Sequence, residues 1–239
     1  MKKISTFLFL LSCLFTAHAQ TLTADSTGSP EQRAAHYFNS FIKLQSRLYN
    51  GPVYRSYGAN VEGSANFQDL DFTLGEVVYD GEKFSDIPLL YDLYQDRVVA
   101  RVGKENRIAL ISNKVASFSI NGHHFRYVDI ADTSKNILKP GFFDFIYDGQ
   151  EKILAKRTKI MDFVSGKAGT DYYFSPKISY YLKQGESYYA FSTANDFLNL
   201  HKDKKNELKQ FMKAQKIKFK KQPEEAMVRL AQHYEKIRQ

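Results

Sequence analysis

Apolar and polar positions alternate with a period of two through the middle of the chain, over residues 53–191. Residues 116–120 alternate apolar side chains with serine, and residues 87–93 place apolar side chains at every second position. Side chains two positions apart share one face of a strand, so this pattern predicts β-strands. Turn dipeptides separate the runs: Asp80-Gly81, Asn121-Gly122, Asp148-Gly149 and Gln184-Gly185. We expect about eight to twelve mostly antiparallel strands, joined by hairpins, in a curved sheet or a barrel-like body.

The period changes to that of a helix in front of this region. Ser29 and Pro30 form a helix start, with Gln32 at the capping-box position. Apolar residues then recur at three- and four-residue spacing as far as the helix stop at residues 50–52; they are Tyr37, Phe41, Leu44 and Leu48. This pattern predicts one N-terminal amphipathic helix.

Helical periodicity returns after residue 192. Thr193 is a predicted N-cap with Asp196 as its partner, a second helix is expected from about Asp203, and Pro223 stands at the start of a third. The apolar stripes of the last two helices are Leu208, Phe211 and Met212, and Met227, Leu230, Ala231 and Tyr234. One helix, many strands and then two to three helices predict an α+β fold with a predominantly antiparallel sheet.

The first residues predict export. Lys2 and Lys3 precede an apolar run that is too short to span a bilayer, and a small-x-small cleavage pattern follows at residues 17–19. The alternative is a lipoprotein anchored at Cys13, and no later run is long enough for a transmembrane helix. The predicted division is a signal peptide over 1–19, a disordered leader over 20–28, a body of helix and antiparallel sheet over 29–191, and a basic helical segment over 192–239 packed on that body.

Composition adds a redox property and a charge pattern. The single cysteine lies in the predicted signal, so the mature chain has no disulfide and no thiolate chemistry. Aromatic residues make up 15% of the chain without a tryptophan, which suits strands but weakens a glycan-binding hypothesis. Residues 20–191 carry twenty Lys and Arg against twenty Asp and Glu, whereas residues 192–239 carry twelve against six. The positive excess of the predicted mature chain therefore lies in its last segment.

The sequence lacks the motifs of common enzyme chemistry. It contains no nucleophile elbow, phosphate-binding loop, dinucleotide fingerprint or His-Glu-x-x-His motif. His123 and His124, with Asp129, suggest a metal site, but neighbours on a strand point to opposite faces, which favours structural or exposed roles. His36, His201 and His233 are expected at the surface or at helix ends. No catalytic residue, metal or cofactor is predicted, and the sequence leans away from an enzyme.

One carboxylate has unusual neighbours. Asp92 lies in the apolar and aromatic run 87–94, where a buried acid needs a partner. Tyr91, Asp92 and Tyr94 are therefore the candidate ligand-binding residues. Asp69 with Asp71, and Asp92 with Asp96, are the candidate acid–base pairs. The other interpretation is that Asp92 faces solvent or bonds a neighbouring strand.

Nine lysines between residues 202 and 221 carry most of the C-terminal charge. Lys204, Lys205, Lys209 and Lys213 are the predicted basic docking face, toward an envelope protein, a lipid or another anionic surface. Nucleic acid is not expected, because the protein is predicted to be exported and has no Arg cluster or nucleic-acid motif. The alternative is a solvated helix face that aids solubility.

Four short runs of sequence carry a resemblance. They are Pro88-Leu89-Leu90-Tyr91-Asp92-Leu93-Tyr94, Arg97-Val98-Val99, Asp203-Lys204-Lys205 and Pro223-Glu224-Glu225-Ala226. With these runs the chain resembles a family of exported bacterial proteins of unassigned function, over most of the mature chain. The resemblance implies a family and brings no activity, ligand or catalytic residue.

Three functions are open on these grounds. The first is a non-catalytic exported or periplasmic envelope protein whose aromatic, strand-rich body binds an apolar or amphipathic ligand or a protein partner. The second is a hydrolase of envelope or extracellular polymers that works through carboxylates. The third is a structural or assembly component that docks through the basic C-terminal helices. We favour the first.

Overall fold

The computed structural model describes residues 29–31, 33, 47–58, 60–129, 137–166 and 169–238. The chain divides into two units, residues 1–42 and residues 43–239. In the first unit Pro30, Glu31 and Arg33 are helical, and the Arg33 N–H donates to the Ser29 carbonyl oxygen at 3.0 Å. The predicted signal peptide, the leader, Cys13 and most of the predicted N-terminal helix lie outside the described residues.

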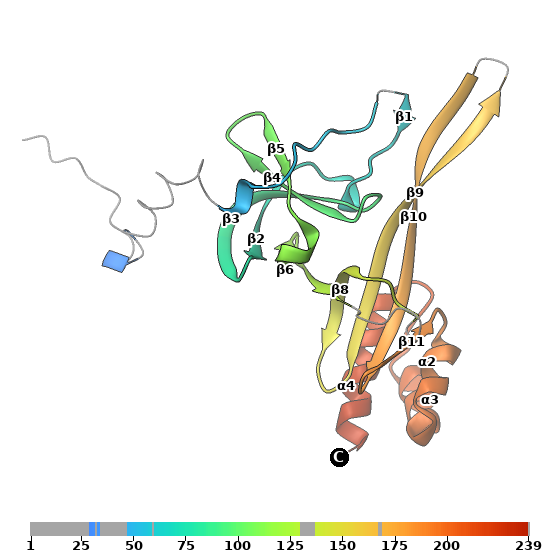
Figure 1. The fold of residues 1–239 in the computed structure, drawn as a ribbon. Coiled ribbons are helices and arrows are strands. Elements are labelled where there is room, and N and C mark those ends of the chain that lie inside the picture. Colours follow the sequence, from blue (N-terminus) through green and yellow to red (C-terminus); the bar gives the residue numbers. More distant parts are fainter. Residues whose placement is uncertain are drawn as a thin grey trace, which may run out of the picture. The chain divides into compact units, whose positions relative to one another are not determined.

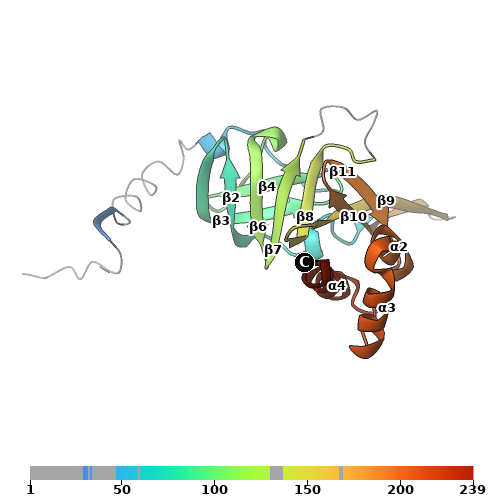
Figure 2. The same ribbon diagram turned by 90° about the horizontal axis from the view of Figure 1, so that it is seen from below.

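An eleven-stranded sheet forms most of the second unit (Figures 1 and 2). Its strands are β1 Val61–Glu62, β2 Thr73–Tyr79, β3 Glu82–Asp92, β4 Arg97–Val102, β5 Asn106–Ala109, β6 Val115–Ile120, β7 His123–Val128, β8 Gly141–Asp148, β9 Lys152–Gly166, β10 Gly169–Gln184 and β11 Ser187–Phe191. Their order is β1-β10-β9-β8-β7-β6-β2-β3-β4-β5, with β11 also beside β10. All pairs are antiparallel except β1 with β10. The sheet is open and mixed, so the predicted strand-rich body is confirmed, whereas a closed barrel is not formed.

The predicted turn dipeptides form hairpins because of their backbone preferences. Asp80 and Gly81 join β2 to β3 with φ values of 52° and 82°, and Asn121 and Gly122 join β6 to β7 with φ values of 47° and 77°. Two consecutive positive φ angles define the turn whose twist matches the flanking strands, and Asx-Gly is the residue pair that adopts it most easily. These two turns therefore confirm the sequence prediction.

An aromatic core fills the curve of the sheet. Phe118 and Phe125 stack with ring centroids 4.7 Å apart, and Tyr91 meets both rings edge-on at 5.0 Å. Phe142 from β8 contacts the same group, and so does Phe67 from the 3-10 turn η2, Phe67–Asp69. Such aromatic pairs add about 0.5–1.5 kcal/mol each beyond the burial of their area. The core therefore ties β3, β6, β7 and β8 together.

Three C-terminal helices pack on the other part of the sheet. They are α2 Ala194–Leu200, α3 Lys205–Ala214 and α4 Pro223–Arg238, and the remaining 3-10 turns are η1 Arg47–Tyr49, η3 Ser112–Lys114 and η4 Lys202–Lys204. Thr193 and Asp196 form the predicted capping box, and α4 begins at Pro223 as predicted. Met227, Leu230, Ala231 and Tyr234 of α4 pack with Ile153 and Leu182 of the sheet. None of the described helices combines the length and the apolar composition that crossing a membrane requires.

Two buried tyrosines of the aromatic core allow a paired test. The Tyr91 hydroxyl donates to Asp96 Oδ1 at 2.6 Å, whereas the Tyr79 hydroxyl is buried without a hydrogen-bond partner among the described residues. We expect Tyr79→Phe to leave the free energy of unfolding unchanged or to raise it by up to about 1 kcal/mol, and Tyr91→Phe to lower it by about 1–3 kcal/mol. Urea denaturation of both variants measures the difference. Equal losses in the two variants would contradict this assignment of the hydroxyls.

Candidate functional site

Asp92 stands at the end of β3 and organises the turn into β4. Its side chain is fully buried, and Oδ1 accepts the N–H groups of Tyr94 and Gln95, both at 2.9 Å. Oδ2 accepts the hydroxyls of Tyr54 at 2.9 Å and Tyr57 at 2.8 Å. Burial and the nearby Asp92 charge raise the pKa of both tyrosines above the usual value, so both remain donors. All four contacts serve the fold, which agrees with the interpretation that Asp92 bonds neighbouring segments.

Asp96 connects the same turn to the far side of the curved sheet. Its Oδ2 lies 2.6 Å from Lys156 Nζ in β9 and accepts the Phe142 N–H of β8 at 3.3 Å. Burial lowers the pKa of Lys156, and the charge of Asp96 opposes that effect. Gly141 makes room for the contact, since a Cβ on it would lie 2.3 Å from Asp96 Oδ2. The β3–β4 turn is thus held against β8 and β9.

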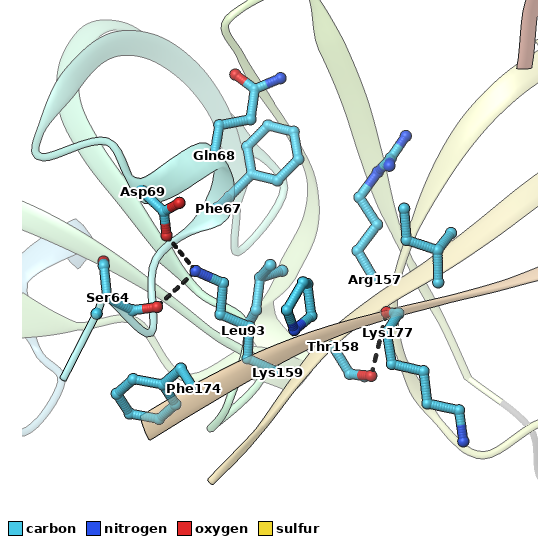
Figure 3. A pocket seen from close by; sticks show the side chains of 13 residues that line it. Ser64, Phe67, Gln68, Asp69, Leu93, Arg157, Thr158, Lys159, Phe174 and Lys177 are labelled. Atoms are coloured by element: carbon cyan, nitrogen blue, oxygen red, sulfur yellow. Dashed lines mark hydrogen bonds and ion pairs between the residues drawn. The ribbon is translucent and has the colours of Figure 1, made fainter. Parts of the chain in front are cut away.

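A pocket of about 450 Å³ opens beside this turn. Its wall consists of Gly63, Ser64, Phe67, Gln68 and Asp69 from the η2 loop, Leu93 from the β3–β4 turn, Arg157, Thr158 and Lys159 from β9, and Phe174, Pro176, Lys177 and Ile178 from β10. Figure 3 shows Lys159 reaching toward the η2 loop from the strand. The volume is within the range of small-molecule sites, about 300–1,000 Å³.

Lys159 is a buried cation in the wall of this pocket, and its ion-pair partner is exposed. The residue is only 9% exposed, and its Nζ donates to the Ser64 carbonyl oxygen at 2.5 Å and pairs with Asp69 Oδ1 (Figure 3). The Asp69 side chain, by contrast, is 73% exposed. A buried ammonium needs a counter-charge, and here a largely solvated carboxylate provides it.

The loop that carries Asp69 has an unusual backbone. Gln68 and Asp69 have φ values of 55° and 56°, in the left-handed region that non-glycine residues seldom adopt. Each such residue costs on the order of 1 kcal/mol, and conformations of this kind concentrate at ligand sites and switch regions. Strain and a solvated acid thus coincide at the mouth of the pocket.

Arg157 lies in the same pocket but its charge is already balanced. Its Nε and Nη2 donate to Asp144 Oδ2 at 2.8 and 2.6 Å, and Nη2 also donates to Glu224 Oε1 of α4 at 2.8 Å. Burial would lower the pKa of Arg157, but the charges of Asp144 and Glu224 outweigh it and raise that pKa. Burial and Glu224 also raise the pKa of Tyr180, to about 12. Arg157 therefore links β8, β9 and α4.

His123 and His124 have separate partners. His123 Nδ1 lies 2.7 Å from Asp144 Oδ2 and Nε2 lies 3.3 Å from Gln68 Nε2, so one proton, on Nδ1, satisfies both contacts. His124 Nδ1 lies 2.8 Å from Ser119 Oγ. Among the described residues, no group of three or more His, Cys, Asp and Glu side chains is arranged to hold a metal ion.

The structure distributes the predicted site residues over different environments. Tyr91 and Asp92 are buried in the framework, and Tyr94 is 44% exposed and meets the ring of Phe174, a pocket residue, at 5.6 Å. On the predicted docking face, Lys209 and Lys213 are exposed. Lys204 and Lys205 are half-buried; Lys205 Nζ donates to Asn199 Oδ1 at 2.6 Å, and Lys204 Nζ lies 3.7 Å from Glu207.

His201 was expected at the surface or at a helix end, and it is the C-cap residue of α2, so the helix-end alternative is confirmed. The ring follows α2 but is fully buried, with Nε2 2.7 Å from Glu151 Oε2 and Nδ1 2.8 Å from the Phe197 carbonyl oxygen. It packs against Tyr234 of α4 at 4.4 Å. Sequence reasoning missed this pair, and it also missed Lys159 and Arg157, because their partners are distant in the chain.

The chain matches no protein-family model, no curated protein and no solved structure.

Asp92 provides a direct test of its structural role. Asp92→Asn replaces one of two charged acceptor oxygens with an amide, so we expect the free energy of unfolding to fall by about 1–3 kcal/mol. Asp71→Asn is the matched control at an exposed carboxylate and should stay within about 0.5 kcal/mol of the parent. Thermal and urea unfolding measure both. An Asp92→Asn variant as stable as the parent would show that the turn does not depend on the carboxylate.

Proposed function

We propose that this protein is a non-catalytic envelope protein that binds an amphipathic ligand with an anionic head group in the pocket between the η2 loop and the β9–β10 hairpin. The observation that carries the proposal is the position of Lys159. Its ammonium group lies at an apolar pocket, and the carboxylate that neutralises it is mostly in solvent on a strained loop.

A carboxylate, sulfate or phosphate group of a ligand can replace the Asp69 carboxylate as the anion that pairs with Lys159. Hydrogen bonds to a charged group contribute about 1.5–3 kcal/mol, and an unpaired buried ammonium is strongly disfavoured. Asp69 therefore serves as an internal substitute that keeps Lys159 neutralised while the pocket is empty. Arg157 is the weaker candidate for a head-group residue, because Asp144 and Glu224 already hold its guanidinium.

The apolar part of the ligand fits the remaining wall. Phe67 and Leu93 line one side, and Phe174, Pro176 and Ile178 follow β10 on the other. These side chains offer contact without hydrogen-bond donors or acceptors, which selects for hydrocarbon. An amphipathic anion therefore matches both the charge and the walls of the pocket.

The alternatives have less support. A carboxylate-dependent hydrolase needs free carboxylates, whereas Asp92 accepts four hydrogen bonds and Asp96 is paired with Lys156. Docking of the basic helices on an anionic surface is compatible with ligand binding, since Lys209 and Lys213 project from α3. Export, which places the protein in the envelope, is supported by the sequence of residues 1–19.

Calorimetric titration with two twelve-carbon amphiphiles below their micelle concentrations tests the proposal. Dodecanoate should bind and dodecyltrimethylammonium should not. Lys159→Met should weaken dodecanoate binding at least about 10-fold, which is about 1.4 kcal/mol. Asp69→Asn should strengthen it several-fold, because the internal competitor for Lys159 is removed.

Lys209→Met, on the exposed face of α3, is the matched control and should leave dodecanoate binding unchanged. Circular dichroism verifies that each variant is folded. Equal binding of the two amphiphiles, or full affinity in folded Lys159→Met, would rule out the anionic head-group site.

A further inference from the structure

The end of the β9–β10 hairpin extends beyond β8 and β11 in the second unit (Figures 1 and 2), and β1 pairs with its β10 edge at Tyr172 and Tyr173. We name residues 160–166 of β9 and 169–175 of β10 the arm. β9 pairs with β10 along the whole arm, but it pairs with β8 only from Lys152 to Ala155. Among the described residues, the outer edge of β9 is thus without a neighbouring strand along the arm.

The backbone groups on this edge can be assigned. The Lys159 N–H donates to the Leu93 carbonyl oxygen at 3.3 Å, so the backbone of Lys159 faces away from β10. Pro176, opposite Lys159, has no N–H to offer β9, which agrees with this orientation. Because the direction alternates along a strand, Met161, Phe163 and Ser165 also point their N–H and C=O groups outward.

The side chains of this edge are apolar on both faces of the arm. Phe163 is 65% exposed, Val164 59% and Ile160 46%, and neighbouring positions face opposite sides. Natural sheets protect open edges with lysine, proline or a bulge. Residues 160–166 contain neither lysine nor proline, and Asp162 is their one charge. The edge therefore has the properties of a pairing surface.

We propose that this edge pairs with the same edge of a second copy of the chain, in a two-fold symmetric antiparallel dimer centred on Phe163. In this register Phe163 faces Phe163, and Met161 faces Ser165 of the second copy. The outward N–H and C=O groups of all three residues then form hydrogen bonds with the second copy. The Lys159 N–H keeps its bond to the Leu93 carbonyl oxygen. A register centred on Asp162 would instead set two like charges opposite each other at the two-fold axis, whereas the proposed register brings like charges together only at its ends, Lys159 with Lys167.

A second copy fits this edge better than a membrane does. A bilayer offers no hydrogen-bond partners to the outward N–H and C=O groups. Asp162 and Asp171 also oppose insertion of the arm into hydrocarbon. The edge is self-complementary in the proposed register, as a two-fold interface requires. This interface is independent of the pocket and of any ligand in it.

Two arginine substitutions at neighbouring, similarly exposed positions test the dimer and its register. Phe163→Arg places two guanidinium groups opposite each other across the two-fold axis, so dimer affinity should fall at least 10-fold. Val164→Arg places the new charge opposite Asp162 of the second copy, so dimer affinity should be unchanged or higher. Sedimentation velocity of the natively processed chain over a concentration series measures both.

Cysteine cross-linking tests the same register by distance. Directly opposite residues of a hydrogen-bonded pair have Cα atoms about 5.5 Å apart, which suits a disulfide. In a Cys13→Ser background, Phe163→Cys should form a covalent dimer on mild oxidation. Ile160→Cys, whose counterpart in this register is Gly166 of the second copy, should not.

Three results would overturn the proposal. The first is a parent chain that sediments as a monomer at every concentration. The second is dissociation of the dimer by both arginine variants, which would indicate non-specific apolar association. The third is cross-linking of Ile160→Cys as readily as Phe163→Cys. Because none of these measurements involves an amphiphile, failure here is distinct from failure of the ligand-binding proposal.

Discussion

The fold depends on two carboxylates at the turn between β3 and β4. Asp92 gathers two backbone amides and two tyrosine hydroxyls, which sets the path of the turn. Asp96 then joins that turn to Phe142 and Lys156 on β8 and β9. Burying an acid such as Asp92 is costly unless it is bonded, and here the bonds of the two acids connect the two sides of a curved sheet. The sheet is open in its strand order, but this contact brings its sides together around the aromatic core.

The β9–β10 hairpin places three environments along one face of a single strand pair. At its base, Ile153 packs with Leu182 beneath the C-terminal helices. In the middle, Lys159 enters the pocket and is held by the η2 loop and by the β3–β4 turn. At its end, Phe163 is mostly exposed. The length of β9 allows this division, because a strand as short as β8 would end at the pocket.

The distribution of net charge along the chain does not show where the buried, paired charges of the pocket lie. The basic excess falls in residues 192–239, yet its lysines lie mainly on exposed helix and loop positions. The two buried cations that line the pocket, Arg157 and Lys159, belong to a region with no net charge. Each is balanced by acids from other elements, so composition conceals them. What distinguishes Lys159 is burial beside a solvated partner, and only the tertiary structure creates that combination.

The sequence by itself determined the local features of this protein. The two Asx-Gly turns, the Thr193–Asp196 capping box and the start of α4 at Pro223 depend on a few adjacent residues, so their patterns predict them. The strand-rich body followed from alternation in the same way. The tertiary structure alone decided the site, since Lys159 and Asp69 are 90 residues apart and Arg157 reaches Glu224 across 67. It also decided that His201 is buried and that the sheet stays open. These outcomes depend on which faces meet when the chain is packed, and that is a sum of many weak contacts that no short stretch of sequence encodes.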